Sequence, residues 1–584
     1  MYVFRTLIGT ALLVAPMIGG SAFGQELAAA ALERVKVRST VQPLGATPFG
    51  EKINLYTGSL SFTQTDVEYP GTGPTILLTR SFNTQRRFVQ SYSFFGDWGF
   101  DIPRIETIVR RPLGSQGTPG GNWIVAPLPG GSARCSQLDI PYEADGSQYL
   151  WWHGYDLIMP GSTRTLMRAA TGLAMPTISL GGSPVTFKGT TTDNWRIGCL
   201  ASTSSGQSGE AFLVVDPAGT KYFLDYLIGR DAGQVLEFDG GTTIRHPVML
   251  VAMMATRIED RFGNFLTFTY SGSRLTGISA SDGRAVSIAW RPETTDLVAS
   301  ITVQAGGTQP RTTTYEYTTI NTLPVLTGVV LPDGSRWSFS NLTQRVGVFS
   351  PVGCGQRTFN PATPTSIPAT TATLTHPGGL VGQFTLRSTY HGKSYVPGWC
   401  DTAPSAHEIN HPVFATYSLT TKQFSGPGLS PRTWSYTYAP VQASASYDPC
   451  AATNSCPDTK WVDVLAPDGV RTRYTFSNRY TELEGKELSA DVYAAGSGAL
   501  VQTTSQTYAA PNAGPYPAAI GDSMVPGNYN LFLEQSIAPL KSSITTQDGT
   551  AFSWSVATGC GGYPYCFDTF GRPTKVNKSS APAP

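Results

Sequence analysis

One repeated pattern constrains the fold of this 584-residue chain more than any other feature. It is clearest in Arg257–Trp290, which reads RIEDRFGNFLTFTYSGSRLTGISASDGRAVSIAW. Large apolar side chains recur at every second position after Gly263, as Phe268 and Tyr270 show, and the same spacing returns after Gly283. A period of two is typical of a strand with one buried face. An aspartate and a glycine ahead of each run favour a tight turn, because glycine accepts positive φ and aspartate bonds to the backbone beyond it.

This turn-and-strand unit occurs seven times. Successive copies lie between 20 and 90 residues apart, so several of them carry insertions. We therefore expect a curled, repetitive sheet in place of a strict solenoid. The glycines that open the copies are Gly219, Gly263, Gly283, Gly334, Gly379, Gly469 and Gly549. The residues that we predict to form the repeat turns are Asp260, Gly263, Asp282, Gly283, Asp333, Gly334, Asp468, Gly469, Asp548 and Gly549.

The composition agrees with an all-β protein. Glycine (62) and proline (43) are abundant, aromatic residues reach 11% and charged residues only 14%. Many turns and short strands are expected from such a mixture, and long helices are not. The formal net charge is +1, which provides no field of one sign to attract nucleic acid. We predict no nucleic-acid partner and no cofactor.

The N-terminus resembles a secretory signal peptide. Arg5 precedes the apolar run Leu7–Ile18, and small residues before Gln25 suit cleavage. An uncleaved anchor is the alternative, but the run is short for a membrane span of about 20 residues. We predict a signal peptide over residues 1–24 and an exported chain that is periplasmic, cell-surface or extracellular and not an integral membrane protein.

Eight cysteines follow this segment, as expected in an oxidising compartment. Eight cysteines allow 105 connectivities, and chain order together with the two six-residue spacings guides our choice. Structural zinc is less favoured, because the chain has no C-x-x-C knuckle. The predicted pairs are Cys135 with Cys199, Cys354 with Cys400, Cys450 with Cys456, and Cys560 with Cys566.

The chain divides into four predicted parts after the signal peptide. Residues 25–48 are expected to be a flexible lead. Residues 49–205 form an N-terminal β domain of meander or sandwich type, in which Ile53–Gly71 and Thr75–Phe82 supply three strands joined by tight turns. Residues 206–345 carry the densest repeats, and residues 346–584 carry further repeat units with Pro-rich insertions.

Residues His407, Glu408 and His411 match the H-E-x-x-H pattern of zinc peptidases. That pattern needs a helix, so that both imidazoles reach one metal ion. Pro412 directly after His411 disfavours α conformation, and no histidine follows as a third ligand. A loop is the favoured interpretation, and a zinc metallopeptidase is an alternative function.

Three other groups of residues suggest chemistry less strongly. Trp151, Trp152 and Tyr155 would stack on sugar rings if exposed, which makes a glycan-binding module a second alternative, although such clusters are more often core. Residues 521–524, Gly-Asp-Ser-Met, resemble an esterase nucleophile block but lie in a Pro-rich loop with no histidine after them. Glu482 and Glu484 lie in a polar stretch that we expect to be solvated.

The segment Asp260–Tyr270, with Gly272 and Leu275, closely resembles the repeat of the Rhs/YD-repeat family, as does DTFGRP at Asp568–Pro573. Ile53–Gly71 resembles the region that precedes these repeats in bacterial members. The resemblance implies a large β-sheet shell that wraps on itself. It identifies no catalytic residue in this chain, because the family's self-cleaving core and toxin tip have no counterpart here.

The sequence therefore predicts a secreted, non-enzymatic shell or surface-binding protein linked to a polymorphic toxin or attachment system. Its expected partners are a separate Rhs-type shell or toxin subunit, or a cell-surface glycan. We expect no catalytic residue.

Overall fold

The computed structural model describes residues 47–86, 94–110, 133–138, 151–239, 242–292, 296–304, 310–342, 345–346, 368–397, 412–524 and 535–582. Phe49–Pro584 forms one compact unit, and Met1–Pro48 is a second. The predicted signal peptide lies outside the described residues. Among those residues no helix has the length and apolar character needed to cross a membrane.

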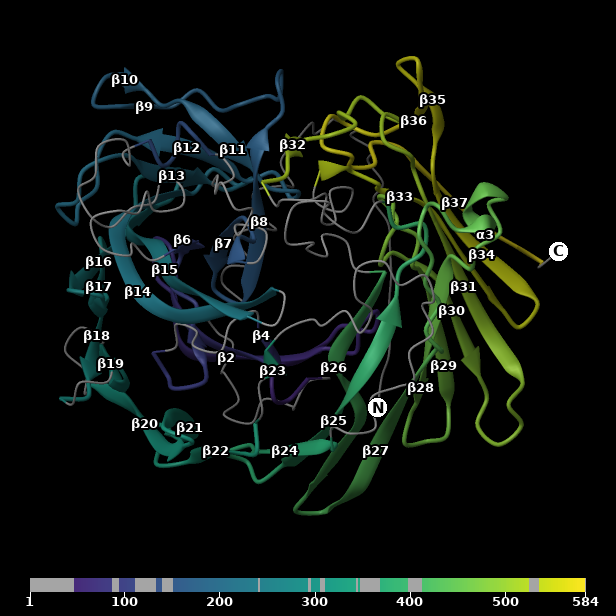
Figure 1. The fold of residues 1–584 in the computed structure, drawn as a ribbon, viewed down its shortest axis with the longest axis horizontal. Coiled ribbons are helices and arrows are strands. Elements are labelled where there is room, and N and C mark those ends of the chain that lie inside the picture. Colours follow the sequence, from purple (N-terminus) through teal and green to yellow (C-terminus); the bar gives the residue numbers. More distant parts are fainter. Residues whose placement is uncertain are drawn as a thin grey trace, which may run out of the picture. The chain divides into compact units, whose positions relative to one another are not determined.

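The predicted all-β class is confirmed (Figure 1). The first strands are β1 (Glu51–Ile53), β2 (Leu60–Tyr69), β3 (Ile76–Asn83), β4 (Gln85–Arg86), β5 (Gly99–Phe100), β6 (Arg104–Arg110), β7 (Tyr155–Met159), β8 (Ser162–Ala169), β9 (Ser179–Leu180), β10 (Ser183–Pro184), β11 (Phe187–Thr190), β12 (Arg196–Leu200) and β13 (Ala211–Val215). The middle strands are β14 (Lys221–Asp239), β15 (Thr242–Glu259), β16 (Phe265–Ser271), β17 (Arg274–Ala280), β18 (Ala285–Trp290), β19 (Val298–Gln304), β20 (Arg311–Ile320), β21 (Leu323–Val330), β22 (Arg336–Ser340), β23 (Arg345–Val346), β24 (Thr370–Thr375) and β25 (Val381–Gly392). The last are β26 (Val413–Gly426), β27 (Leu429–Tyr438), β28 (Thr459–Leu465), β29 (Arg471–Ser477), β30 (Glu487–Tyr493), β31 (Leu500–Tyr508), β32 (Gly521–Asp522), β33 (Leu540–Gln547), β34 (Thr550–Val556), β35 (Thr558–Cys560), β36 (Tyr563–Tyr565) and β37 (Val576–Pro582), with one short helix, α3 (Pro449–Ala452), before β28.

The repeat turns share one backbone geometry. In the turn that opens β16, Gly263 N–H donates to the Asp260 carbonyl, and Asp260 N–H donates to the Asn264 carbonyl. The Asp260 carboxylate accepts the side-chain amide of Asn264 and the backbone N–H groups of Phe262 and Asn264, which lowers its pKa. Gly263 has a φ of 86°. This is a three-residue hairpin loop that ends in a left-handed glycine. The same pair of backbone bonds recurs in the turns that contain Gly219, Gly283, Gly334, Gly379 and Gly469.

The last copy differs. Asp548 and Gly549 both have positive φ, 48° and 70°, and Gln547 pairs directly with Thr550. This is a two-residue turn, in which both central residues are left-handed. Phe552, three residues after Gly549, is 51% exposed, whereas Tyr222 and Trp337 at the same offset of other copies are partly buried.

Eight strands of the described chain close into a ring. Successive antiparallel pairings run β6-β7-β8-β11-β12-β13-β14-β15, and β15 then returns to β6. The long strand β15 makes this closure possible, since Val248–Met254 pairs with β6 while Arg257–Glu259 pairs with β16. Through β16 the sheet leaves the ring and continues.

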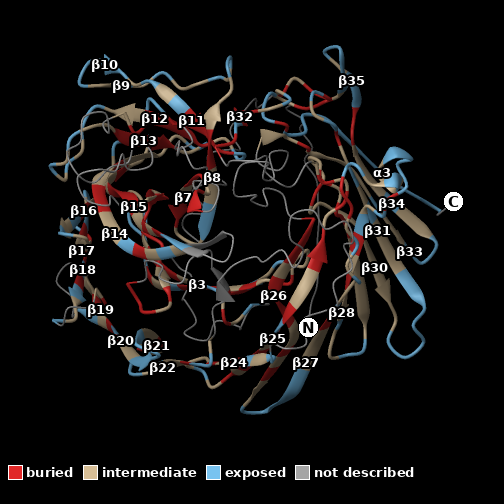
Figure 2. Ribbon diagram, viewed as in Figure 1, coloured by how far each residue is buried: buried red, intermediate tan, exposed pale blue. Residues whose placement is uncertain are grey.

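From β15 onward the sheet runs, neighbour by neighbour, through the repeat hairpins to β34 and β37; we call this sheet the wall (Figure 1). The pairing of β12 with β13 and of β22 with β24 carries the sheet past the predicted boundaries near residues 205 and 345. Along the wall, burial is high in β25 and β26 and falls toward β37, which is exposed along its whole length (Figure 2).

The predicted meander exists, with the strand order β1-β2-β3-β5. Its apolar side chains and those of the wall form one hydrophobic cluster. Phe49, just before β1, lies with its ring centroid 6.2 Å from that of Trp337, 5.9 Å from Phe384 and 5.5 Å from Phe424. The meander therefore supplies the other half of the wall's core.

A buried ion pair lies at the centre of this contact. Arg80 of β3 donates to Asp66 of β2 through Nε at 2.5 Å and through a second nitrogen at 3.0 Å. The guanidinium lies 5.0 Å from the ring centroid of Trp98, and the wall residue Tyr315 donates its hydroxyl to Asp66 at 2.8 Å. The ion pair thus links β2 with β3, and the Tyr315 hydrogen bond links both strands to the wall.

A second link joins the ring to a segment far along the chain. The Gly521–Asp522 part of the esterase-like block forms β32 and pairs with Arg168–Ala169 of β8. Next to it, Trp152 donates its indole N–H to the Met524 carbonyl at 2.6 Å. The block that we expected to be a loop turn is therefore a short strand that anchors the C-terminal part of the sheet to the ring.

The positive φ at Gly263 gives a stability prediction. A β-carbon there would meet no atom within 4 Å, so the cost of a substitution is conformational. Gly263→Ala should lower the free energy of unfolding by about 1 kcal/mol, because L-residues disfavour the left-handed region. Gly263→Asn is the matched control and should lose less, because asparagine tolerates this region. Urea unfolding of the three proteins measures the difference, and an equal loss in both variants would contradict the turn assignment.

The buried ion pair gives a second prediction. Arg80→Met leaves the Asp66 carboxylate buried without its counter-charge and should lower the free energy of unfolding by about 3–5 kcal/mol. The double variant Arg80→Met/Asp66→Asn removes both charges and should recover much of that loss. The coupling is obtained from a double-mutant cycle in urea. Additive effects of the two substitutions would show that the two buried charges do not stabilise each other.

Candidate functional site

The candidate site lies where a turn of the meander meets the wall. Residues 54–59, between β1 and β2, contact β26; we call this contact region the seam. The Thr57 carbonyl accepts the hydroxyls of Thr416 and Ser418 at 2.6 and 2.7 Å. Gly58 has a φ of 74°, and a β-carbon there would come within 2.5 Å of Ser418. Glycine is therefore required for this close approach.

A small pocket opens at the seam, with a cavity volume of about 10 Å³, which is room for about one water molecule. Its lining comes from five separate stretches of the chain. They are Leu55–Tyr56 in the meander turn, His391–Gly392 at the end of β25, Tyr438–Gln442 after β27, Lys460–Trp461 in β28, and Phe476 in β29. Most of these side chains are aromatic or apolar, and two are titratable bases.

Lys460 is the most unusual of them. It is buried, and its Nζ has no hydrogen-bond partner among the described residues. The Nζ atom lies 3.4 Å from the ring centroid of Tyr56 and 5.4 Å from that of Phe414. Burial lowers the pKa of Lys460 well below its usual value, and the charge of Lys393 lowers it further, while Glu484 opposes the shift.

The other bases and acids of the seam are engaged. His391 Nε2 lies 3.1 Å from the Ser418 hydroxyl, and burial with the nearby Lys460 holds the pKa of His391 well below its ordinary value. The Glu484 carboxylate pairs with Lys393 Nζ at 2.8 Å and accepts the Tyr56 hydroxyl at 3.4 Å. Burial, followed by the Glu484 charge, raises the pKa of Tyr56.

Glu484 corrects one expectation. We expected a solvated residue, but its side chain is only 4% exposed and faces Lys393. The reason is tertiary: Glu484 pairs with Lys393 and accepts the hydroxyl of Tyr56 from the meander turn, so the stretch around it packs on the seam.

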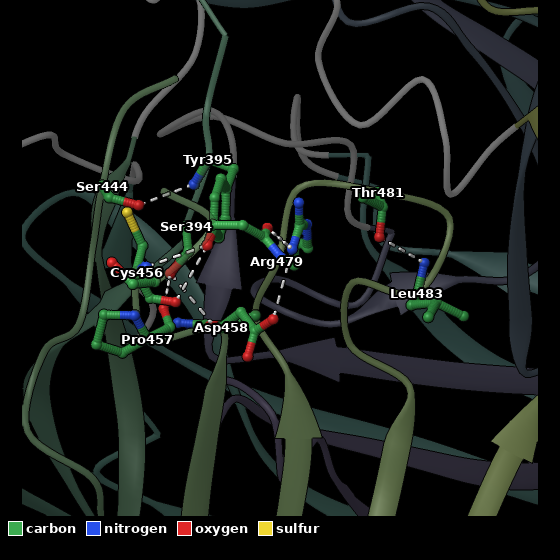
Figure 3. A network of polar contacts seen from close by, with 12 residues as sticks. Ser394, Tyr395, Ser444, Cys456, Pro457, Asp458, Arg479, Thr481 and Leu483 are labelled. Carbon is green, nitrogen blue, oxygen red and sulfur yellow. Dashed lines mark hydrogen bonds and ion pairs between the residues drawn. The ribbon is translucent and has the colours of Figure 1, made fainter. Parts of the chain in front are cut away.

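A polar network beside the pocket fixes these segments (Figure 3). Ser394 follows His391 by three residues, and its hydroxyl donates to the Pro457 carbonyl and lies 3.4 Å from Asn478 Oδ1. Tyr395 has a φ of 60°; its N–H donates to the Ser444 hydroxyl, and its hydroxyl accepts Cys456 N–H. The segment after β25 thus connects the segment before β28 with the segment after β29. Lys460 lies in β28 and Phe476 in β29.

The network is reinforced from outside. The Arg479 guanidinium lies 3.9 Å from the Tyr395 ring centroid and 3.7 Å from Asp458 (Figure 3). The Cys450–Cys456 disulfide closes the loop ahead of β28, with a Cα–Cα distance of 4.8 Å. The pocket therefore lies next to a part of the wall that hydrogen bonds, an ion pair and a disulfide hold together.

Two further disulfides are present, Cys135–Cys199 and Cys560–Cys566. With Cys450–Cys456 they are three of the four pairs suggested by chain order. Cys354 and Cys400 lie outside the described residues. Three disulfides fit an oxidising environment.

The sequence-derived sites fare differently. His407, Glu408 and His411 lie outside the described residues, and within those residues no cluster of three or more His, Cys, Asp or Glu side chains has a metal-binding arrangement. Trp151 and Trp152 are 1% and 4% exposed, so the surface that the glycan alternative requires is buried in the core.

Sequence reasoning missed the pocket. Its residues come from positions 55 to 476, and only the fold brings them together. One signal was present: Lys460 occupies a place in an alternating run whose next inward residue, Val462, is buried. Lysine is rarely buried, so a lysine at an inward position of a strand indicates an unusual tertiary environment.

The described chain is thus an all-β protein with a closed ring of strands, a long wall and an internal meander. No model of a known protein family matches it, and no curated protein matches it significantly. Crystal structures titled TcdB2-TccC3 and TcdB2-TccC3-TEV align with 87% and 89% of this chain, at 11% and 12% identity and TM-scores of 0.18 and 0.17. The alignments span 21% and 26% of those chains. Such low values establish neither a shared fold nor a shared function.

The depressed pKa of His391 gives a pH prediction. Below about pH 6.5 the unfolded chain binds a proton at His391 that the folded protein does not bind, so stability should fall as the pH drops. The contribution is at most about 1.4 kcal/mol per pH unit. His391→Gln should remove this slope between pH 6.5 and 5.5. His376→Gln, at a partly buried histidine whose pKa burial also lowers, should change it less. Urea unfolding at each pH measures the slopes, and an unchanged slope in His391→Gln would contradict the assignment.

Proposed function

We propose that this protein is an exported, non-enzymatic shell of Rhs/YD-repeat type that works with a separately made shell or toxin subunit in intercellular competition or attachment. One observation carries the proposal: the wall of repeat hairpins buries its apolar face on a segment of its own chain. A sheet that encloses polypeptide has the physical property that a shell needs.

Two further observations support it. The turn geometry of Asp260–Asn264 recurs at Asp568–Arg572, where Gly571 N–H donates to the Asp568 carbonyl and Asp568 N–H to the Arg572 carbonyl. These are the two segments that resemble the family repeat. The disulfides fit an exported protein, for which we propose a mature N-terminus near Gln25.

A strain of the source organism that lacks the gene tests the function. The deletion strain should lose its advantage in mixed culture with a competitor, or its attachment to surfaces, and the wild-type gene should restore it. Arg80→Met, which weakens the contact between meander and wall, should not restore it. His407→Ala is the matched control and should restore it fully, because no catalytic role is proposed for that residue.

The same strains identify the outcomes that contradict the proposal. A deletion strain that behaves as wild type in both assays would remove the proposed role. Stoichiometric zinc in the purified protein, lost in His407→Ala together with the restored phenotype, would favour the peptidase. Fractionation and N-terminal sequencing check the export and the cleavage near Gln25.

A further inference from the structure

The Cys450–Cys456 disulfide closes a loop that anchors two other segments of the chain (Figure 3). At the end of this loop, Cys456 N–H donates to the Tyr395 hydroxyl at 3.1 Å. The next residue, Pro457, accepts the Ser394 hydroxyl through its carbonyl. The main chain at the end of the disulfide loop therefore holds the segment that follows β25.

The same stretch anchors the segment that follows β29. The Asp458 carbonyl accepts Asn478 N–H at 2.9 Å, and the Asp458 carboxylate lies 3.7 Å from Arg479. Tyr480 N–H donates in turn to the Ser394 carbonyl at 2.9 Å. The two anchored segments are therefore bonded to each other as well as to the disulfide loop.

Each anchored segment carries one partner of the ion pair that meets the meander turn. Lys393 directly precedes Ser394, and Glu484 lies four residues after Tyr480. Lys393 Nζ lies 2.8 Å from the Glu484 carboxylate, which also accepts the Tyr56 hydroxyl at 3.4 Å. The contact between Tyr56 and the wall thus depends on two segments that end on the disulfide loop.

Tyr395 shows that this anchoring acts against a backbone preference. Its φ of 60° lies in the left-handed region, which residues with a β-carbon disfavour. Such a conformation persists where the surrounding structure fixes it. Here the Ser444 hydroxyl accepts Tyr395 N–H, and the Tyr395 hydroxyl accepts Cys456 N–H. Freedom gained by the loop at Cys456 would let Tyr395 relax.

A small thiol can reach the disulfide. Cys450 is partly exposed and residues 452–455 are exposed, whereas Cys456 is buried. A thiolate that attacks Cys450 Sγ forms a mixed disulfide and releases Cys456 as the thiolate, and a second thiolate then frees Cys450. Two reductant thiols become one disulfide, and their two electrons and two protons reduce Cys450 and Cys456 to thiols.

We propose that the Cys450–Cys456 disulfide is a redox-sensitive clamp on the seam. While it is closed, it fixes the segments that carry Lys393 and Glu484. When a small thiol such as glutathione reduces it, the loop before β28 gains freedom, and the meander turn of residues 54–59 separates from β26 more often. The closed state suits an oxidising compartment, and the open state a reducing one. The clamp does not rest on the proposed function, because it concerns contacts within one chain.

Amide hydrogen exchange of the full mature protein tests the clamp. One sample is kept oxidised and another is incubated with excess reduced glutathione, and differential alkylation with mass spectrometry maps which disulfides have opened. Peptides that cover residues 54–59 and 394–395 should exchange on the order of 10-fold faster after reduction, because the disulfide no longer restricts the loop. Strand β16 (Phe265–Ser271), far from the seam in the sheet order, should not change.

Two double variants provide the controls. Cys450→Ser/Cys456→Ser should show the faster exchange of residues 54–59 without any reductant. Cys560→Ser/Cys566→Ser removes a disulfide of the same six-residue separation outside the seam and should leave that exchange unchanged. If the first variant does not fold, the two wild-type samples decide.

Two results would overturn the proposal. The first is a wild-type sample in which alkylation shows Cys450–Cys456 open while residues 54–59 exchange at the oxidised rate. The second is a Cys450–Cys456 bond that stays closed in excess glutathione. Neither result affects the shell function, because the strain assays do not depend on this disulfide.

Discussion

The structure depends on the burial of the wall's apolar face against the N-terminal meander. Strands of the repeat hairpins alternate apolar and polar side chains, so one face of the sheet must be covered. Phe49 contacts Trp337, Phe384 and Phe424, which come from three strands of the wall. Around it, the rings of Phe62 and Trp98 extend the same cluster to Phe384 and Phe339. Where this cover ends, toward β37, the strands become exposed.

The seam is a consequence of that packing. Placing a turn of the meander on β26 buries the polar groups of both partners, and each must find a new bond. Most do so: Thr57 accepts two hydroxyls, and Glu484 pairs with Lys393. Lys460 is left with an aromatic ring. Its burial thus arises from the way the meander packs on the wall.

The parts of the fold that depend on local signals could be predicted from the sequence. Gly263 and Gly334 are left-handed, and Asp260 binds the backbone beyond it, because turn chemistry acts over five residues. The three-residue loop length, in place of a two-residue turn, was not evident from an Asp-Gly pair alone. Contacts over long separations could not be predicted, and the pairing of β32 with β8, the burial of Glu484 and the pocket around Lys460 all belong to that class. Each of these features depends on contacts between segments that are far apart in the sequence. The alternation of apolar and polar residues carries no information about such contacts.

Amide hydrogen exchange tests the central claim, that the meander is the inner half of the wall's core. If it is, Leu60–Tyr69 and Ile76–Asn83 should exchange as slowly as the wall strand Val413–Gly426. The exposed strand Val576–Pro582 is the internal reference and should exchange far faster. Meander strands that exchange as fast as Val576–Pro582 while Val413–Gly426 stays protected would show that the wall holds its fold without them, and would contradict the account.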